Sequence, residues 1–123
     1  MGSVKHDARG SEVKVGKGAL RSDPRLAELV SLLKAYQPEQ IILFGSHARG
    51  QADEFSDYDI VVIKRTDRTF LERMQDMVPY LVAFDRPADI FVYTPDEYEG
   101  MSQCGLGWMA HKEGIVLYER EPS

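Results

Sequence analysis

The segment from Gly45 to Asp59 constrains this chain most, because it joins a Gly-Ser pair at the end of one predicted strand to an Asp-x-Asp triplet at the start of the next. The run Ile41–Phe44 is short and wholly apolar, which predicts a buried strand that ends at the glycine. The run Asp57–Ile63 predicts the next strand, and ten residues lie between the Gly-Ser pair and its first aspartate. A tight turn and two carboxylates are therefore expected at neighbouring strand ends, where they could hold a phosphate chain and divalent metals side by side.

Gly45 and Ser46 predict a phosphate-binding turn. With no Cβ, Gly45 can adopt dihedral angles that other residues avoid, and it lets a phosphate approach the backbone. Ser46 is a favourable N-cap for a short helical turn, so its hydroxyl and the free N–H groups at the start of that turn would bind phosphate. Arg49 could also reach a phosphate, although an ion pair with Asp53 or Asp57 fits the sequence equally well.

Asp57 and Asp59 predict a metal site. Alternate residues of a strand lie on the same face, about 6–7 Å apart, and two carboxylates placed there repel each other unless a cation intervenes. Carboxylate oxygens are the ligands that hard cations such as Mg²⁺ prefer, and a two-metal site needs more than two aspartates. The best third ligand is Asp89, which begins the next apolar run; Asp85 and Asp96 are alternatives, in a turn and in the first turn of a helix.

This pattern of Gly-Ser, ten residues, Asp-x-Asp and a later strand aspartate resembles the DNA polymerase β-type nucleotidyltransferase superfamily. At 123 residues the chain is similar to the minimal nucleotidyltransferases (MNT), which are often antitoxin partners of HEPN-domain toxins. The likeness spans Pro24 to Glu119. It includes the phrases Gly-Ser-His-Ala-Arg-Gly, Ser-Asp-Tyr-Asp-Ile-Val-Val, Tyr-Thr-Pro-Asp-Glu-Tyr and Glu-Gly-Ile-Val-Leu-Tyr-Glu. The resemblance implies that Gly45 and Ser46 bind the triphosphate, and that the metal ligands are Asp57, Asp59 and Asp89.

The resemblance also implies a reaction and a partner. Two Mg²⁺ ions, or Mn²⁺ in their place, would serve the transfer of AMP from ATP to a hydroxyl group, and a HEPN toxin is the expected acceptor. Two alternatives are an antitoxin that binds nucleotide and masks its partner without catalysis, and an antibiotic-type transferase that modifies a small molecule. The base preference and the oligomeric state, including a homo-oligomer, stay open.

The order of predicted elements indicates an α/β (α+β) fold, in which a small mixed sheet with helices packed against it resembles the polymerase β palm. Residues 1–22 are expected to form a flexible tail and residues 23–121 the nucleotidyltransferase domain. Helices are predicted from Pro24 to about Tyr36, over Thr69–Met77 with Pro79 as its end, and from Pro95 to Met101. Further predictions are a helical turn carrying Trp108 and Met109, and a strand over Ile115–Tyr118.

Composition narrows the function classes further. A net charge of −5 argues against nucleic acid as the main ligand, because proteins that bind nucleic acids usually present a broad basic surface. A single cysteine, Cys104, cannot form an internal disulfide. The sequence shows neither a secretory segment nor an apolar stretch that could span a bilayer, so a cytoplasmic protein without a membrane partner is expected.

Overall fold

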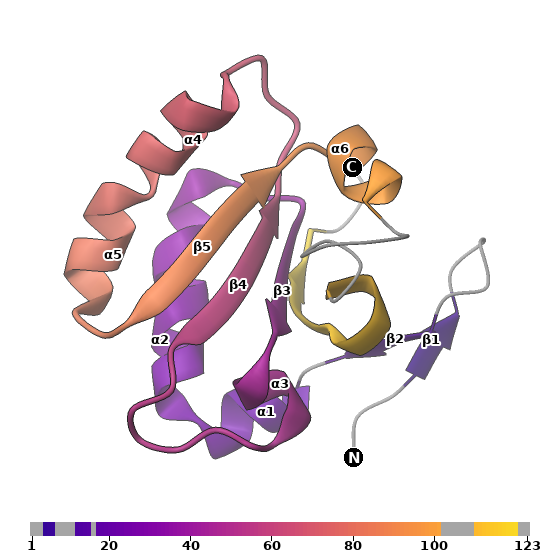
Figure 1. Cartoon of the computed structure of the whole chain (residues 1–123), viewed down its shortest axis with the longest axis vertical. Helices are drawn as coiled ribbons and strands as arrows, with labels where there is room; N and C mark the ends of the chain where they lie inside the picture. The colour runs from indigo at the N-terminus through magenta and orange to yellow at the C-terminus, as the bar shows by residue number, and fades with distance from the viewer. Residues whose placement is uncertain (1–3, 7–11, 16, 102–109, 121–123) are drawn as a thin grey trace.

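The protein is described from a computed structural model, which places residues 4–6, 12–15, 17–101 and 110–120. Its strands form a six-stranded sheet in the order β1-β2-β6-β3-β4-β5 (Figure 1). The strands are Val4–His6 (β1), Glu12–Val15 (β2), Gln40–Phe44 (β3), Tyr58–Ile63 (β4), Ala88–Tyr93 (β5) and Ile115–Glu119 (β6). The helices are Lys17–Ser22 (α1), Pro24–Leu33 (α2), Lys34–Tyr36 (η1), Ser46–Arg49 (α3), Phe70–Asp76 (α4), Val78–Phe84 (α5) and Pro95–Gly100 (α6). Residues 110–113 are also helical.

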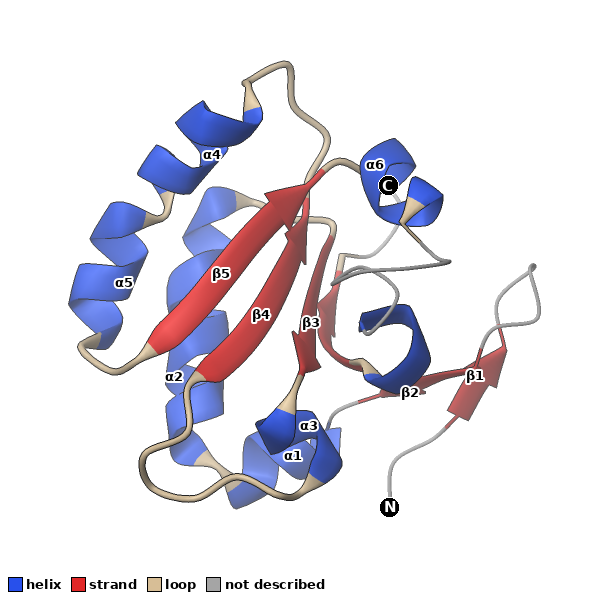
Figure 2. Ribbon diagram, viewed as in Figure 1, coloured by secondary structure: helices blue, strands red, loops and turns tan. Residues whose placement is uncertain are grey.

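The sheet is mixed and is covered on both faces, which confirms the predicted fold class. β4 lies between antiparallel β3 and parallel β5. Its four apolar residues, Ile60 to Ile63, are all buried, as predicted for a central strand. One face packs against α2 and α5, which Figure 2 shows on the same side of the sheet, through Ile41, Leu43, Ile60, Val62 and Ile90. The opposite face packs against Tyr98 of α6 and Ala110 through Ile42, Phe44, Val61 and Ile63.

Polar caps fix where several helices begin. The Asp23 side chain accepts a hydrogen bond from the Arg25 N–H, with Pro24 in the first helical position, so α2 starts where the sequence predicts. Helix α4 begins with a capping box, in which the Thr69 hydroxyl accepts from the Glu72 N–H and the Glu72 carboxylate accepts from the Thr69 N–H. The predicted helix start near residue 70 is thus explained by local hydrogen bonding.

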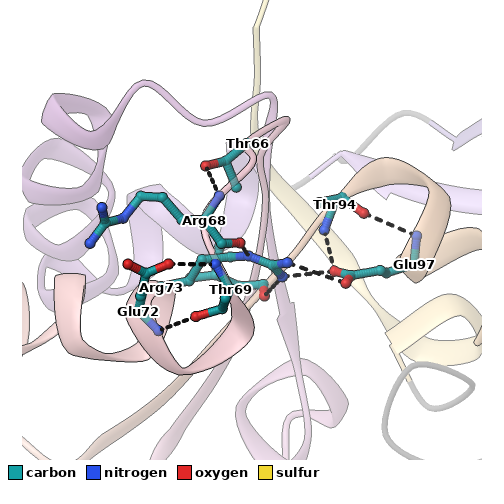
Figure 3. Close-up of polar contacts among 8 residues, drawn as sticks. Thr66, Arg68, Thr69, Glu72, Arg73, Thr94 and Glu97 are labelled. Atoms are coloured by element: carbon teal, nitrogen blue, oxygen red, sulfur yellow. Dashed lines mark hydrogen bonds and ion pairs between the residues drawn. The ribbon is translucent and has the colours of Figure 1, made fainter.

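A buried arginine joins α4 to α6. Arg73, whose side chain is 6% exposed, forms a two-pronged ion pair with Glu97, at 2.7 and 3.2 Å. Its guanidinium also donates to the carbonyl groups of Val92 and Arg68 (Figure 3). Glu97 is the acidic member of the capping box that begins at Thr94, so one carboxylate starts α6 and pairs with α4. The C-terminal end of β5 is therefore fixed to both helices.

The structure corrects two predictions about chain organisation. Residues 1–22 are expected to be a tail, but β2 pairs in parallel with β6, β1 pairs with β2, and Leu20 of α1 packs against the core. These elements are too short to give a periodic signal, and they cover backbone groups of β6 that would otherwise face solvent. Pro79 was predicted to end a helix, whereas it lies in the first turn of a second one, α5, where a missing N–H costs nothing.

Candidate functional site

Two of the predicted metal ligands are direct neighbours across a pair of parallel strands. β4 and β5 are paired so that Asp59 lies opposite Asp89. Adjacent strands are about 4.8 Å apart, and alternation along each strand places both residues on the face of Val61 and Phe91, which is the α6 face. Asp57 precedes β4, which begins at Tyr58 instead of the predicted Asp57. The strands therefore position two of the three carboxylates, and the loop before β4 carries the third.

The surroundings of Asp59 disfavour its charged form. Burial raises its pKa, and the charges of Asp89 and then Asp57 raise it further, whereas His47 and Arg49 lower it. Like charges close together disfavour ionisation. The three carboxylates named from the sequence are thus electrostatic neighbours, with two cationic or ionisable side chains of the Gly-Ser loop beside them.

Gly45 is the residue that brings the loop against this carboxylate. Its φ of +77° lies in a region that side chains rarely adopt, and a Cβ at this position would collide with the Asp59 carboxylate. Helix α3 starts directly after it, so the predicted helical turn is present. The N-cap residue is Gly45 and not Ser46, and Ser46 is the first helical residue. A side chain at Gly45 would therefore disturb both the turn and the acidic group behind it.

Glu113 joins the loop from the helical residues before β6. Its Oε1 accepts a hydrogen bond from the Gly45 N–H at 3.1 Å and from Nη1 of Arg49 at 2.9 Å. Arg49 also donates from Nε to Oε1 of Gln51 at 3.1 Å. The sequence offered Asp53 or Asp57 as ion-pair partners of Arg49, and the structure assigns Glu113 instead.

His47 and Tyr58 link the loop to the start of β4. Their rings stack with centroids 3.9 Å apart, and Nε2 of His47 donates to the Ser56 carbonyl at 3.2 Å. The Tyr58 hydroxyl donates to Oδ2 of Asp23 at 2.6 Å, and burial together with this acidic partner raises the pKa of Tyr58 to about 12. His47 is half-buried, and these contacts hold the loop against the start of β4.

The positions of Glu113 and His47 depend on contacts that the sequence does not reveal. The contact between Arg49 and Glu113 joins residues 64 positions apart, so no local pattern predicts it. The one sequence signal for Glu113 is that it begins Glu-Gly-Ile-Val-Leu-Tyr-Glu, a phrase that carries the resemblance but assigns the glutamate no role. The prediction of a turn at Trp108 and Met109 lies outside the described residues.

The chemistry of the three aspartates fits Mg²⁺, but their side chains do not converge on one point. Across the described ranges, no group of three or more His, Cys, Asp or Glu side chains is arranged so that it could hold a metal ion. Mg²⁺ is commonly bound by one or two carboxylates together with substrate phosphates and water. The in-register pair of Asp59 and Asp89 meets that requirement, with phosphate oxygens as the remaining ligands.

No helix in the described part of the chain is long and apolar enough to cross a membrane.

Comparison with known sequences identifies a family. The family profile described as polymerase beta, nucleotidyltransferase matches residues 27–123, which is most of the chain. No curated protein sequence matches the chain. The expected superfamily is thereby confirmed, and the match includes the Gly-Ser loop and all three aspartates.

Solved structures with the same fold include chains from toxin–antitoxin complexes and a separate protein from Sulfolobus solfataricus. A toxin–antitoxin structure with AMP-PNP contains a chain of 20% sequence identity and TM-score 0.55, over 77% of this chain and 73% of that chain. A Sulfolobus solfataricus protein assigned as a nucleotidyltransferase gives 23% identity and TM-score 0.56, over 85% and 90%. A chain in the complex of a tri-AMPylated Shewanella oneidensis HEPN toxin with an MNT antitoxin gives 17% and 0.51, over 79% and 71%. At these identities the likeness shows a shared fold.

Proposed function

The chain belongs to the polymerase beta nucleotidyltransferase family, and on that premise we propose that it transfers AMP from ATP to a hydroxyl group of a partner protein. The observation that carries the proposal is the site itself. A Gly-Ser loop, held by Gly45 against Asp59, lies beside the in-register pair of Asp59 and Asp89. A phosphate-binding turn and metal-binding carboxylates are the two parts that this reaction needs.

The residues of the site have three proposed roles, which are phosphate binding, metal binding and proton transfer. The backbone N–H groups of the loop, the Ser46 hydroxyl and Arg49 hold the β- and γ-phosphates. Asp57, Asp59 and Asp89 would hold the Mg²⁺ ions together with phosphate oxygens and water, and the ions would stabilise charge on the attacking and leaving oxygens. The acceptor oxygen forms a bond to the α-phosphorus as the bond to the β-phosphate oxygen breaks. Pyrophosphate leaves, and Asp89 takes the proton of the acceptor hydroxyl.

A partner protein is proposed as the acceptor because of the surface that two helices expose. Helices α4 and α5 follow each other on one side of the sheet (Figure 2) and expose Leu71, Val78 and Val82, at 67%, 54% and 71%. Exposed large apolar side chains on two successive helices support a protein–protein interface on that side of the molecule. Among the chains of similar fold, one comes from a complex in which a HEPN toxin is tri-AMPylated. We infer that a mostly helical HEPN-type protein is the partner and the acceptor.

The test uses the chain, ATP, Mg²⁺ and the protein encoded beside it. Intact-mass spectrometry should show the partner heavier by one or more AMP units after incubation with the wild-type protein. Asp89→Asn should abolish the mass increase. Asp85→Asn is the matched control, because Asp85 is exposed, ends α5 with a φ of +54° that asparagine tolerates, and should transfer AMP normally.

Each other outcome identifies a different error. If Asp89→Asn is active and Asp85→Asn is inactive, the third carboxylate has been assigned wrongly. A partner that is neutralised but never modified would replace this proposal by that of an antitoxin that masks its partner. AMP on a small-molecule acceptor, with no modified protein, would favour the antibiotic-type transferase.

A further inference from the structure

The loop proposed to hold the triphosphate already holds an anion of the protein itself. One oxygen of Glu113, Oε1, accepts from both the Gly45 N–H and Nη1 of Arg49, at 3.1 and 2.9 Å. These are two of the donors that the proposed function gives to the nucleotide phosphates. Hydrogen bonds between a cation and a carboxylate are stronger than neutral ones, so these donors already have a strongly bound partner.

The position of Glu113 is set by the sheet. Gly114 follows it, donates its N–H to the Ala110 carbonyl at 2.8 Å, and packs so closely that a Cβ would collide with that carbonyl and with Ile42 of β3. The next residue, Ile115, is paired with Leu43 of β3. The Gly-Ser loop follows the end of β3, and Glu113 precedes the start of β6, which is paired with that end of β3. The backbone of Glu113 is therefore fixed beside the loop, and only its side chain is free to move.

We propose that Glu113 occupies the triphosphate position while the site is free, and that the nucleotide binds by displacing its carboxylate. This inference rests on the proposed function, and it adds that nucleotide affinity is reduced by competition from the Glu113 carboxylate. The single Gly45 N–H cannot donate fully to Glu113 and to a phosphate oxygen at once, and a phosphate placed there would meet the negative charge of the carboxylate that Arg49 also holds. The glutamate side chain can rotate into solvent, since it is already 23% exposed, while its backbone stays in place.

Competition between Glu113 and phosphate predicts the opposite change in ATP affinity from a role in which Glu113 only orients Arg49. If Glu113 competes with phosphate, Glu113→Gln and Glu113→Ala bind ATP with Mg²⁺ more tightly than the wild type. The neutral amide keeps the shape but pairs less strongly with Arg49, and a tenfold gain corresponds to about 1.4 kcal/mol. If Glu113 merely orients Arg49, its removal weakens binding. The two roles thus move the dissociation constant in opposite directions.

The experiment is calorimetric titration of the full chain with three probes, each in the presence of Mg²⁺. We expect both Glu113 variants to bind ATP and pyrophosphate about tenfold more tightly, and adenosine as the wild type does, because only the phosphates meet the carboxylate. Glu54→Gln is the control for net charge, since it removes one negative charge from the loop between α3 and β4, and it should leave each affinity within about threefold. Without nucleotide, Glu113→Gln should melt lower than the wild type, and ATP should raise its melting temperature more.

The outcomes separate this inference from the function on which it rests. Equal or weaker ATP binding by both Glu113 variants, with the wild type binding normally, overturns the inference and leaves the proposed function standing. A gain shared by Glu54→Gln also overturns it, because the effect would then come from net charge alone. Binding of ATP to none of the proteins overturns both.

Discussion

Replacing Arg73 by methionine should lower the free energy of unfolding by about 2–3 kcal/mol. Methionine keeps much of the aliphatic packing but removes four hydrogen bonds, two to Glu97 and two to the carbonyl groups of Val92 and Arg68. A buried carbonyl that loses its donor costs about 1–3 kcal/mol. Glu97 is 43% exposed, so water replaces its lost partner and the ion-pair contribution is about 1 kcal/mol or less. For a domain of this size, the melting temperature should fall by roughly 8–12 °C.

The chain contains a matched control for this change. Arg68 forms an ion pair with Asp76 that is also two-pronged, at 2.7 and 2.9 Å, but its side chain is 49% exposed. Urea denaturation followed by circular dichroism should therefore show a clearly smaller loss for Arg68→Met than for Arg73→Met. Equal losses in the two variants would refute the reasoning, because burial would then not decide what these pairs contribute.

Two further predictions concern titration near the site. Without divalent metal, Asp59→Asn should melt at or above the wild-type temperature at neutral pH, because burial and the neighbouring carboxylates raise the pKa of Asp59. Melting curves should converge below about pH 4, where the carboxyl is protonated in both states; a lower melting temperature for the variant at neutral pH would contradict this. Between about pH 10 and pH 12 the wild type should lose more stability than Tyr58→Phe, because the unfolded chain releases the phenol proton near pH 10. In the folded chain burial and Asp23 raise the pKa of Tyr58 to about 12, and urea titrations that fall equally with pH would refute the effect.

The parts of the fold that sequence predicts best are those with a complete local signal. The apolar runs of β3, β4 and β5 are each bounded on at least one side by glycine, aspartate or proline, and the strands lie within one residue of those boundaries. The start of α2 follows from Asp23 and Pro24 in the same way. In these segments the residues that set where the element begins or ends are adjacent to it in the chain, although the strands themselves are hydrogen-bonded to distant segments.

Other parts depend on contacts that no local pattern encodes. Helix α5 has no side-chain cap and contains a proline in its first turn, and it is held by packing of Phe84 against the core. Glu113 reaches Arg49 only because β6 pairs with β3. The roles of the aspartates and of the loop stay predictions, since the structure gives their placement and charge environment while the chemistry is tested by transfer assays.

The pairing of Asp59 with Asp89 makes the strand register itself a condition for activity. Sliding β5 by one residue along β4 would bring Ile90 opposite Asp59 and turn the Asp89 side chain toward α2 and α5. A refolded sample could then retain its secondary structure and still lack the acidic pair. The yield of active protein would thus measure the fraction of molecules in which the two strands are correctly aligned.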